Sequence, residues 1–161
     1  MSDNMRLYFF RHAEAEPGSD SVPDDARQLT SRGIERTRRA ATVLKALKIA
    51  PVRLFSSPLA RARQTADLLG QTLGTPVQVR NELGPGFNAE AVDALVRDLG
   101  SGAEVLFVGH EPDFSATISA LIGGGWITMK KGGLARVDVD DAQPMRGSLV
   151  WLIPPKFFDA Q

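Results

Sequence analysis

The sequence predicts a three-layer α/β/α sandwich, in which helices cover both faces of a mostly parallel central sheet. Three observations indicate this class. Short apolar runs of β type alternate regularly with longer segments of helical period. The chain has 161 residues, a length that fits one domain with a substantial core. The sequence contains no repeat, low-complexity tract or linker, so we expect a single domain over residues 1–161.

Four short runs rich in branched and aromatic residues predict the parallel strands. They cover residues 6–10, 52–55, 77–79 and 105–108. Each run is separated from the next by a stretch long enough for a helix, which is what a parallel crossover requires. The order of elements is therefore βαβα in the first two thirds of the chain.

Four amphipathic segments between and after these strands predict helices. Thr30 is placed to cap the first helix, Gly74 ends the second, Gly100 closes the third, and residues 123–125 stop the fourth. Their apolar stripes are, in chain order, Ala40, Val43, Leu44 and Leu47; Ala62, Ala66, Leu69 and Leu73; Val92, Leu95, Val96 and Leu99; and Phe114, Ile118, Leu121 and Ile122.

The pattern changes after the fourth helix. Residues 135–139 alternate between apolar and polar, residues 140–147 are rich in turn formers, and residues 148–153 are strand-like again. This segment predicts a hairpin, and we expect one of its strands to join the sheet.

The composition excludes several function classes. The 19 basic and 19 acidic side chains give a net charge of zero, which argues against nucleic-acid binding and against attachment to a membrane surface. The absence of cysteine removes disulfides, thiolate metal sites and cysteine nucleophiles. No segment resembles an export signal or a membrane span. We expect a cytoplasmic monomer.

Reactive side chains follow all four predicted strands. In parallel sheets, ligands bind beyond the carboxyl ends of the strands, so these positions are the first place to search for a site. Two histidines, two arginines and one carboxylate converge there from four places. The residues concerned are Arg11 and His12 after the first strand, Arg61 shortly after the second, Glu82 after the third and His110 after the fourth.

A cluster of two imidazoles and two guanidiniums favours a polyanionic ligand, because the four groups repel one another when all are charged. A phosphoryl group fits best. The guanidinium fork matches its oxygens, and backbone N–H groups at the start of the helical segment 57–73 are further donors. Arg61 lies in the first turn of that segment and is predicted to point into the same pocket.

The chemistry of these side chains suggests a different role for each in the reaction. Arg11 disfavours protonation of the adjacent His12, which keeps that ring neutral and nucleophilic. Protonated His110 is then the donor to the phosphoryl oxygens in the transition state. Glu82 is the candidate general acid and base.

Three segments resemble motifs of the histidine phosphatase superfamily. Residues 7–13 resemble its Arg-His-Gly signature, residues 57–65 resemble its second-arginine segment, and residues 108–110 resemble its second histidine motif. The three occur in the family's order. The resemblance implies an α/β sandwich of the phosphoglycerate mutase type and a phosphohistidine intermediate, with no metal and no cofactor.

Transferred residue by residue, the resemblance makes His12 the phosphorylated nucleophile. It places Arg11, Arg61 and His110 in the phosphate pocket. Ala13 stands where the family most often has glycine, a change that matters if the backbone there needs a positive φ. Glu82 is the weakest transfer, since the SixA-type branch does not uniformly keep an acid at this position.

The length of the chain favours the SixA-type branch, whose members act on phosphohistidine. The stretch between Glu82 and His110 is filled by a turn, a helix and a strand, which leaves no room for a lid of the kind that encloses small metabolites. We therefore expect an open site that admits phosphohistidine presented by a protein. Lys130 and Lys131 are either part of a solvated turn or a contact for an acidic partner.

Other readings remain open. A small phosphoester is the alternative substrate, although the missing lid disfavours a mutase. A metal-dependent hydrolase would use His12, Glu14, His110 and Glu111, but the spacing is not that of a zinc helix motif. A phosphoprotein-binding module without catalysis would need the arginines alone, so the two histidines argue against it.

Overall fold

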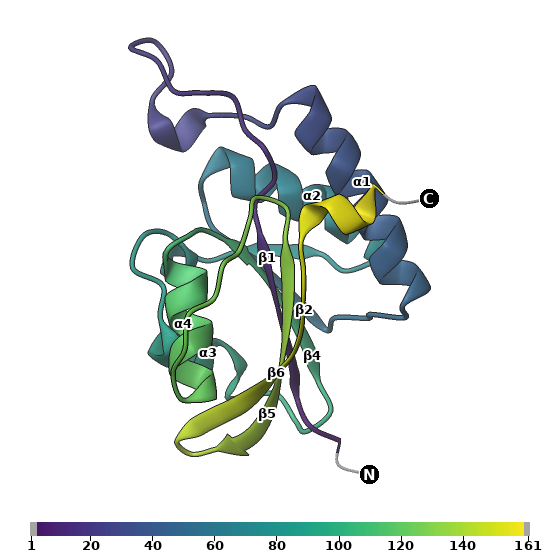
Figure 1. Cartoon of the computed structure of the whole chain (residues 1–161), viewed down its shortest axis with the longest axis vertical. Helices are drawn as coiled ribbons and strands as arrows, with labels where there is room; N and C mark the ends of the chain where they lie inside the picture. The colour runs from purple at the N-terminus through teal and green to yellow at the C-terminus, as the bar shows by residue number, and fades with distance from the viewer. Residues whose placement is uncertain (1–2, 160–161) are drawn as a thin grey trace.

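The computed structural model describes residues 3–159 and contains six strands, four α-helices and three short 3-10 helices (Figure 1). The bounds are β1 Arg6–Arg11, η1 Asp24–Ala26, α1 Ser31–Ala46, β2 Arg53–Ser56, α2 Ala60–Leu73, β3 Val77–Val79, η2 Asn81–Leu83, α3 Ala89–Val96, β4 Glu104–Gly109, α4 Asp113–Ile122, β5 Leu134–Ala142, β6 Met145–Ile153 and η3 Pro155–Phe158.

The strands form one sheet in the order β3-β2-β4-β1-β5-β6. The first four strands of the chain, β1 to β4, pair with one another in parallel, whereas β5 runs antiparallel to β1 and β6 antiparallel to β5. The mostly parallel α/β sheet predicted from the sequence is confirmed. Both hairpin strands join the sheet, although we expected one, because β5 pairs with β1 on one side and with β6 on the other.

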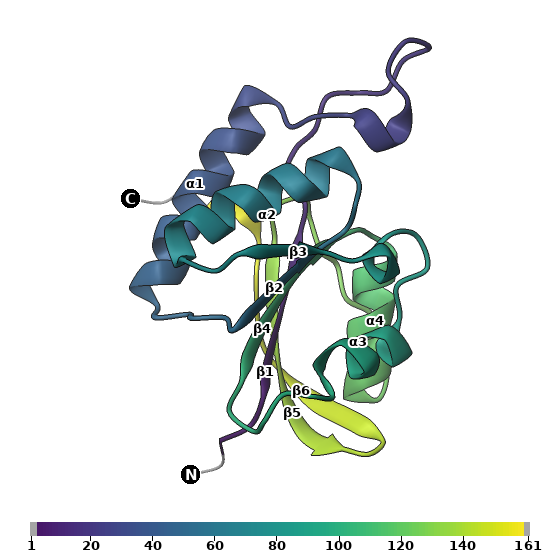
Figure 2. The same cartoon turned by 180° about the vertical axis from the view of Figure 1, so that it is seen from behind.

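Helices cover both faces of this sheet. Figure 1 and Figure 2 show α1, α2 and η3 on one face and α3 and α4 on the other. Small residues of α1 and α2, including Ala40, Ala41, Ala62 and Ala66, are fully buried on the first face and bring these helices close to the strands. In the sheet β4 lies between β1 and β2. Helix α1 follows β1 on one face, whereas α4 follows the neighbouring strand β4 on the other face (Figure 1).

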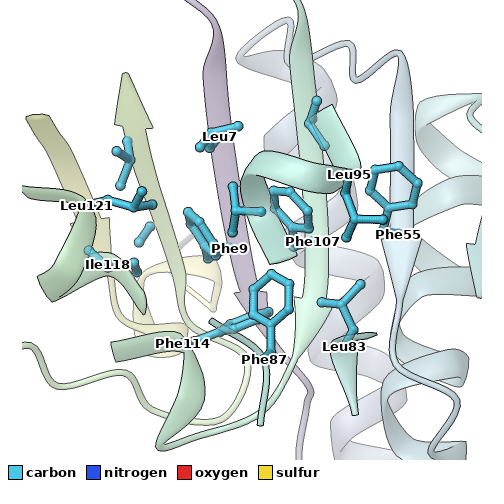
Figure 3. Packing of buried hydrophobic residues seen from close by; sticks show 14 of the residues in the cluster. Leu7, Phe9, Phe55, Leu83, Phe87, Leu95, Phe107, Phe114, Ile118 and Leu121 are labelled. Carbon is cyan, nitrogen blue, oxygen red and sulfur yellow. The ribbon is translucent and has the colours of Figure 1, made fainter. Parts of the chain in front are cut away.

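An aromatic cluster beneath α4 supports the carboxyl ends of β1 and β4 (Figure 3). The Phe9 and Phe107 rings stack with their centroids 5.3 Å apart, and Phe114 meets Phe9 edge-on at 5.4 Å. A Cβ at Gly109 would lie 2.8 Å from the Phe114 ring, so glycine is what permits α4 to approach the end of β4. This packing fixes the strand end that precedes His110.

Several predicted ends differ from the structure. Helix α1 ends at Ala46 and leaves Leu47 54% exposed, because the chain turns there instead of continuing the apolar stripe. Helix α3 ends at Val96, so Leu99 packs against the core from a turn. The turn expected over residues 140–147 is shorter, since the paired strands extend to Ala142 and from Met145.

Within residues 3–159, none of the helices has the length and apolar character needed to cross a membrane.

Candidate functional site

The site lies where three neighbouring strands end. In the sheet β4 lies between β1 and β2, and Arg11 at the end of β1 is paired with Gly109 at the end of β4. The backbone N–H of His12 donates to the Gly109 carbonyl at 3.0 Å, which extends this pairing by one residue. The two histidine rings that follow have centroids 5.2 Å apart. The convergence predicted from the strand ends is therefore present for His12 and His110.

The His12 ring is held by two hydrogen bonds that fix its tautomer. Its Nδ1 lies 2.8 Å from the Ala13 carbonyl oxygen, which accepts, so the ring nitrogen must carry the proton. Its Nε2 lies 3.3 Å from Nε of Arg61, a donor, so Nε2 must present its lone pair. The imidazole is therefore oriented with Nε2 as its nucleophilic atom.

The environment keeps this ring neutral. Burial is the largest cause that lowers the pKa of His12, to about 3, and the charges of His110, Arg61 and Arg11 lower it further against the Ala13 hydrogen bond. The sequence predicts the same direction from the adjacent arginine alone. In the structure desolvation contributes more, because the side chain is 4% exposed.

Arg61 joins the histidine to the loop that contains η1. It is the second residue of α2 and is buried, with Nε on the His12 ring. Its two terminal nitrogens both contact Asp24, Nη1 at 2.8 Å from the backbone carbonyl and Nη2 at 3.2 Å from the carboxylate. The guanidinium thus lies between the His12 ring and an acidic side chain.

His110 contacts Ser57, the first residue after β2. Its Nε2 lies 2.7 Å from Ser57 Oγ, while its Nδ1 is buried and has no hydrogen-bond partner among the described residues. Burial first, and then the charge of Arg61, lower the pKa of His110 to about 4. The ring is therefore neutral at pH 7, in contrast to the protonated form predicted from the sequence. A phosphoryl dianion in the pocket favours that protonated form, so the predicted charge requires bound substrate.

Arg11 reaches the site from β1. Its Nη1 donates to the Met129 carbonyl at 2.8 Å, and its Nε is buried without a partner among the described residues. Burial lowers the pKa of Arg11, and the nearby Glu111 carboxylate opposes that shift. A buried donor with no acceptor is consistent with a pocket made for an anion.

The backbone after His12 is fixed by α1 and α2. The Ala13 N–H donates to Thr65 Oγ1 at 3.1 Å, and Thr65 in turn donates to the Arg61 carbonyl at 2.8 Å. Among described non-glycine residues a positive φ is recorded for Lys48, so Ala13 has an ordinary conformation. The departure from the family's glycine at this position therefore introduces no backbone strain.

The site is buried, whereas the sequence predicts an open one. The side chains of His12, Arg61 and His110 are all buried, with residue exposures of 4%, 7% and 9%. η1 in the long β1–α1 connection contributes one contact to the site, where Asp24 binds the Arg61 guanidinium. Sequence reasoning searched for a lid between Glu82 and His110 and missed this segment, since no periodic pattern marks it.

Glu82 lies apart from the other predicted site residues. Its carboxylate pairs with Arg80 at 3.3 Å on the surface, and no contact with the two histidines or with Arg11 and Arg61 is recorded. Its role as proton donor stays a prediction.

Lys130 and Lys131 lie exposed in the turn before β5 and line a cavity of about 410 Å³ beside α1. Gly132, the next residue, donates to the carbonyls of Arg11 and His12, both at 3.0 Å. The turn is therefore attached to the backbone of the site.

The carboxylates required by the metal-dependent alternative have other partners. Glu14 accepts from Thr30 Oγ1 at 3.0 Å, and Glu111 accepts from the Ser115 N–H at 2.8 Å. Within residues 3–159 no group of three or more metal-ligating side chains of the His, Cys, Asp or Glu type lies together.

Comparison with known families agrees with this geometry. A model described as "Histidine phosphatase superfamily (branch 1)" matches residues 7–84. Phosphohistidine phosphatase SixA of Escherichia coli K12 is 30% identical over 156 residues, which cover 94% of each chain. An uncharacterized protein of Picosynechococcus sp. is 33% identical over 165 residues, which cover 93% of this chain and 100% of that protein.

Solved structures are similar over nearly the whole fold. The structure of the protein histidine phosphatase SixA complexed with tungstate has a TM-score of 0.83 at 29% identity, covering 95% of this chain and 99% of that one. A putative phosphohistidine phosphatase SixA from Agrobacterium tumefaciens has a TM-score of 0.78 at 25% identity, with coverage of 93% and 98%. The strand ends described above therefore belong to a fold that this chain shares with the SixA structures.

Proposed function

We propose that this chain, which belongs to the histidine phosphatase superfamily, removes the phosphoryl group from phosphohistidine on a partner protein. The chain is a phosphatase of that superfamily. The finer assignment of substrate is supported by its similarity to phosphohistidine phosphatase SixA of Escherichia coli and by the two SixA structures it resembles.

The single observation that carries the mechanism is the fixed orientation of His12. With the proton held on Nδ1 by the Ala13 carbonyl, the Nε2 lone pair faces Arg61 and is ready to attack phosphorus. A nucleophile that is already neutral and oriented needs no proton removed before it reacts.

The first half-reaction transfers the phosphoryl group to the enzyme. The Nε2 lone pair of His12 forms the bond to phosphorus, and the bond from phosphorus to the substrate nitrogen breaks. The electron pair of that bond stays on the leaving imidazole, which departs as a neutral ring because its other nitrogen already carries a proton, and therefore needs less help from a proton donor than an alkoxide does. Arg61, Arg11 and protonated His110 stabilise the oxygens of the transferred group.

The second half-reaction restores the enzyme. Water attacks phosphorus on the phosphorylated His12, the P–Nε2 bond breaks, and the electron pair returns to the ring. Phosphate then leaves. The reaction proposed here uses no metal and no cofactor, because the imidazole and the cations together provide the nucleophile and the charge stabilisation.

A small phosphoester is the second candidate substrate, and the burial of the site favours it. His12, Arg61 and His110 are each at most 9% exposed, a burial that suits a small molecule. Comparing rates on both substrate classes decides between them.

The test compares wild type with His12→Ala on a histidine-phosphorylated protein and on a panel of phosphorylated metabolites, with EDTA present throughout. We expect wild type to act faster on the phosphoprotein and His12→Ala to lose turnover and acid-labile protein-bound phosphate. Arg63→Ala is the matched control, because Arg63 pairs with Asp67 on the surface of α2 and should keep full activity. Activity in a folded His12→Ala protein contradicts the mechanism, and faster metabolite turnover contradicts the substrate.

The proposal also includes a cytoplasmic monomer with a single domain over residues 1–161. Light scattering of the purified protein tests the oligomeric state, and fractionation of the source cells tests the location.

A further inference from the structure

An acidic side chain that the proposed mechanism does not use lies at the phosphate pocket. Asp24, the first residue of η1, places Oδ2 3.2 Å from Nη2 of Arg61. Arg27 approaches the other carboxylate oxygen, with Nε 3.1 Å from Oδ1. The carboxylate is thus held by one cation of the site and by one of its own loop.

The same guanidinium connects this carboxylate to the nucleophile. Arg61 donates from Nε to His12 Nε2 at 3.3 Å and from Nη2 to Asp24 at 3.2 Å. Two contacts of one rigid planar group cannot lie far apart. A phosphoryl group on Nε2 of His12 would therefore lie near the Asp24 carboxylate.

The Asp24 carboxylate is ionised and accessible to solvent. The Arg61 guanidinium, more than any other group, lowers the pKa of Asp24, and Arg27 acts in the same direction. The carboxylate is therefore ionised at neutral pH. Its side chain is 71% exposed, so a solvent molecule can reach it and a proton can leave from it.

We propose that Asp24 is the general base of the second half-reaction, activating the water that hydrolyses phosphorylated His12. This inference rests on the proposed function. One O–H bond of the water breaks and its proton goes to an Asp24 oxygen. The water oxygen forms the bond to phosphorus, the P–Nε2 bond breaks, and its electron pair returns to the His12 ring. Asp24 then releases its proton to solvent.

Asp24 is connected to the proposed nucleophile through Arg61, whereas Glu82 is not. Glu82 is paired with Arg80 on the surface, whereas Asp24 contacts a residue that also contacts the nucleophile. Asp24 is also within electrostatic reach of His110, whose pKa it raises. A carboxylate in this place supports both the water and the protonated form of His110.

The test separates the two half-reactions by rapid quench with p-nitrophenyl phosphate. In Asp24→Asn the amide oxygen can still accept from Arg61 but is not a base, so we expect a normal burst of nitrophenolate followed by slow turnover. Steady-state turnover should fall about 100-fold or more, and acid-labile phosphate should accumulate on His12. Asp25→Asn is the matched control, since Asp25 is exposed on the same turn and Arg61 contacts Asp24 instead.

A second variant, Asp24→Ala, tests whether a carboxylate is needed as the base. In Asp24→Ala the phosphorylated intermediate should also accumulate, and added sodium formate should speed its hydrolysis by supplying a carboxylate. Formate should have no effect on wild type. Accumulation that formate does not relieve contradicts a proton-transfer role and leaves Asp24 as a structural anchor for η1.

Three further outcomes overturn the inference in distinguishable ways. Turnover in Asp24→Asn equal to that of Asp25→Asn, without accumulation, removes Asp24 from the reaction. Faster turnover with tighter tungstate binding means that the carboxylate only competes with anions for Arg61. If wild type itself forms no phosphorylated His12 from any donor, the proposed function fails and the role of Asp24 fails with it.

Discussion

At the scale of single residues, the site depends on close backbone approaches. Gly33 in α1 packs directly against the chain that follows His12, and a Cβ at that position would lie 2.3 Å from the Glu14 carbonyl oxygen. The same carbonyl accepts from the Thr30 N–H at 3.0 Å. The helix therefore holds the segment that carries the Ala13 carbonyl, which sets the tautomer of His12.

Gly33→Ala should destabilise the protein by about 1–3 kcal/mol, because the added methyl group meets backbone that cannot rotate away. It should also lower phosphatase activity by displacing residues 13–14. Denaturant unfolding and a turnover assay measure the two effects. Gly100→Ala is the control, since its Cβ would meet nothing within 4 Å and its φ is not positive. Equal stabilities for the two variants would contradict this account of α1.

At the scale of elements, the short 3-10 helix η3 adds to the helical layer on the α1 side of the sheet. The 3-10 helix η3 lies beside α1 (Figure 1), and its Phe158 is 2% exposed against the sheet. The Phe158 ring lies 6.4 Å from that of Phe10 in β1, one residue before Arg11. Arg36 of α1 also pairs with Asp159. The end of the described chain thus supports β1, the strand that precedes His12.

Phe158→Ala should lower the free energy of unfolding by about 3–5 kcal/mol through the cavity it leaves. Its neighbour gives a matched comparison, since Phe157 is 60% exposed and Phe157→Ala should change stability by about 0.5 kcal/mol or less. Chemical denaturation of both variants is the measurement. A similar loss in each would show that η3 does not pack as described.

At the scale of the whole molecule, folding buries two imidazoles in an environment rich in positive charge. Their pKa values fall to about 3 for His12 and about 4 for His110, against about 6.5 in an unfolded chain. The chain as a whole is formally neutral, with 19 basic and 19 acidic residues. The pocket around the two histidines is nevertheless rich in positive charge, which disfavours their protonation and favours an anion. Keeping both rings neutral costs the folded state stability below pH 6.5, where the unfolded chain binds a proton at each histidine.

The sign of the resulting pH dependence follows from linkage. Below pH 6.5 the unfolded chain binds a proton at each histidine while the folded chain does not, so stability falls as pH is lowered. Between pH 6 and 5 each histidine should approach a contribution of about 1.4 kcal/mol per pH unit. Urea unfolding at several pH values measures this slope, and His110→Gln should reduce it by one histidine's share. An unchanged slope in that variant would contradict the low pKa of His110.

The sequence by itself predicted that Arg11, His12 and His110 lie at one edge of the sheet. Arg11, His12 and His110 directly follow strands, and parallel strands bring their carboxyl ends to one edge, so local pattern and one topological rule were sufficient. The approximate positions of the strands and helices were predictable for the same reason, since hydrophobic periodicity is a local property. Their ends were less predictable, as the exposed Leu47 illustrates, because tertiary packing decides where a helix stops.

Only the tertiary structure decided the chemistry within that set. The tautomer of His12 depends on Arg61 and on the Ala13 carbonyl, and the neutral state of His110 depends on burial. The placement of Asp24 over Arg61, like the pairing of Glu82 with Arg80, depends on how an irregular segment folds back. Contacts between residues distant in sequence and without periodic signal carry no local code, so the structure alone identified the carboxylate at the pocket.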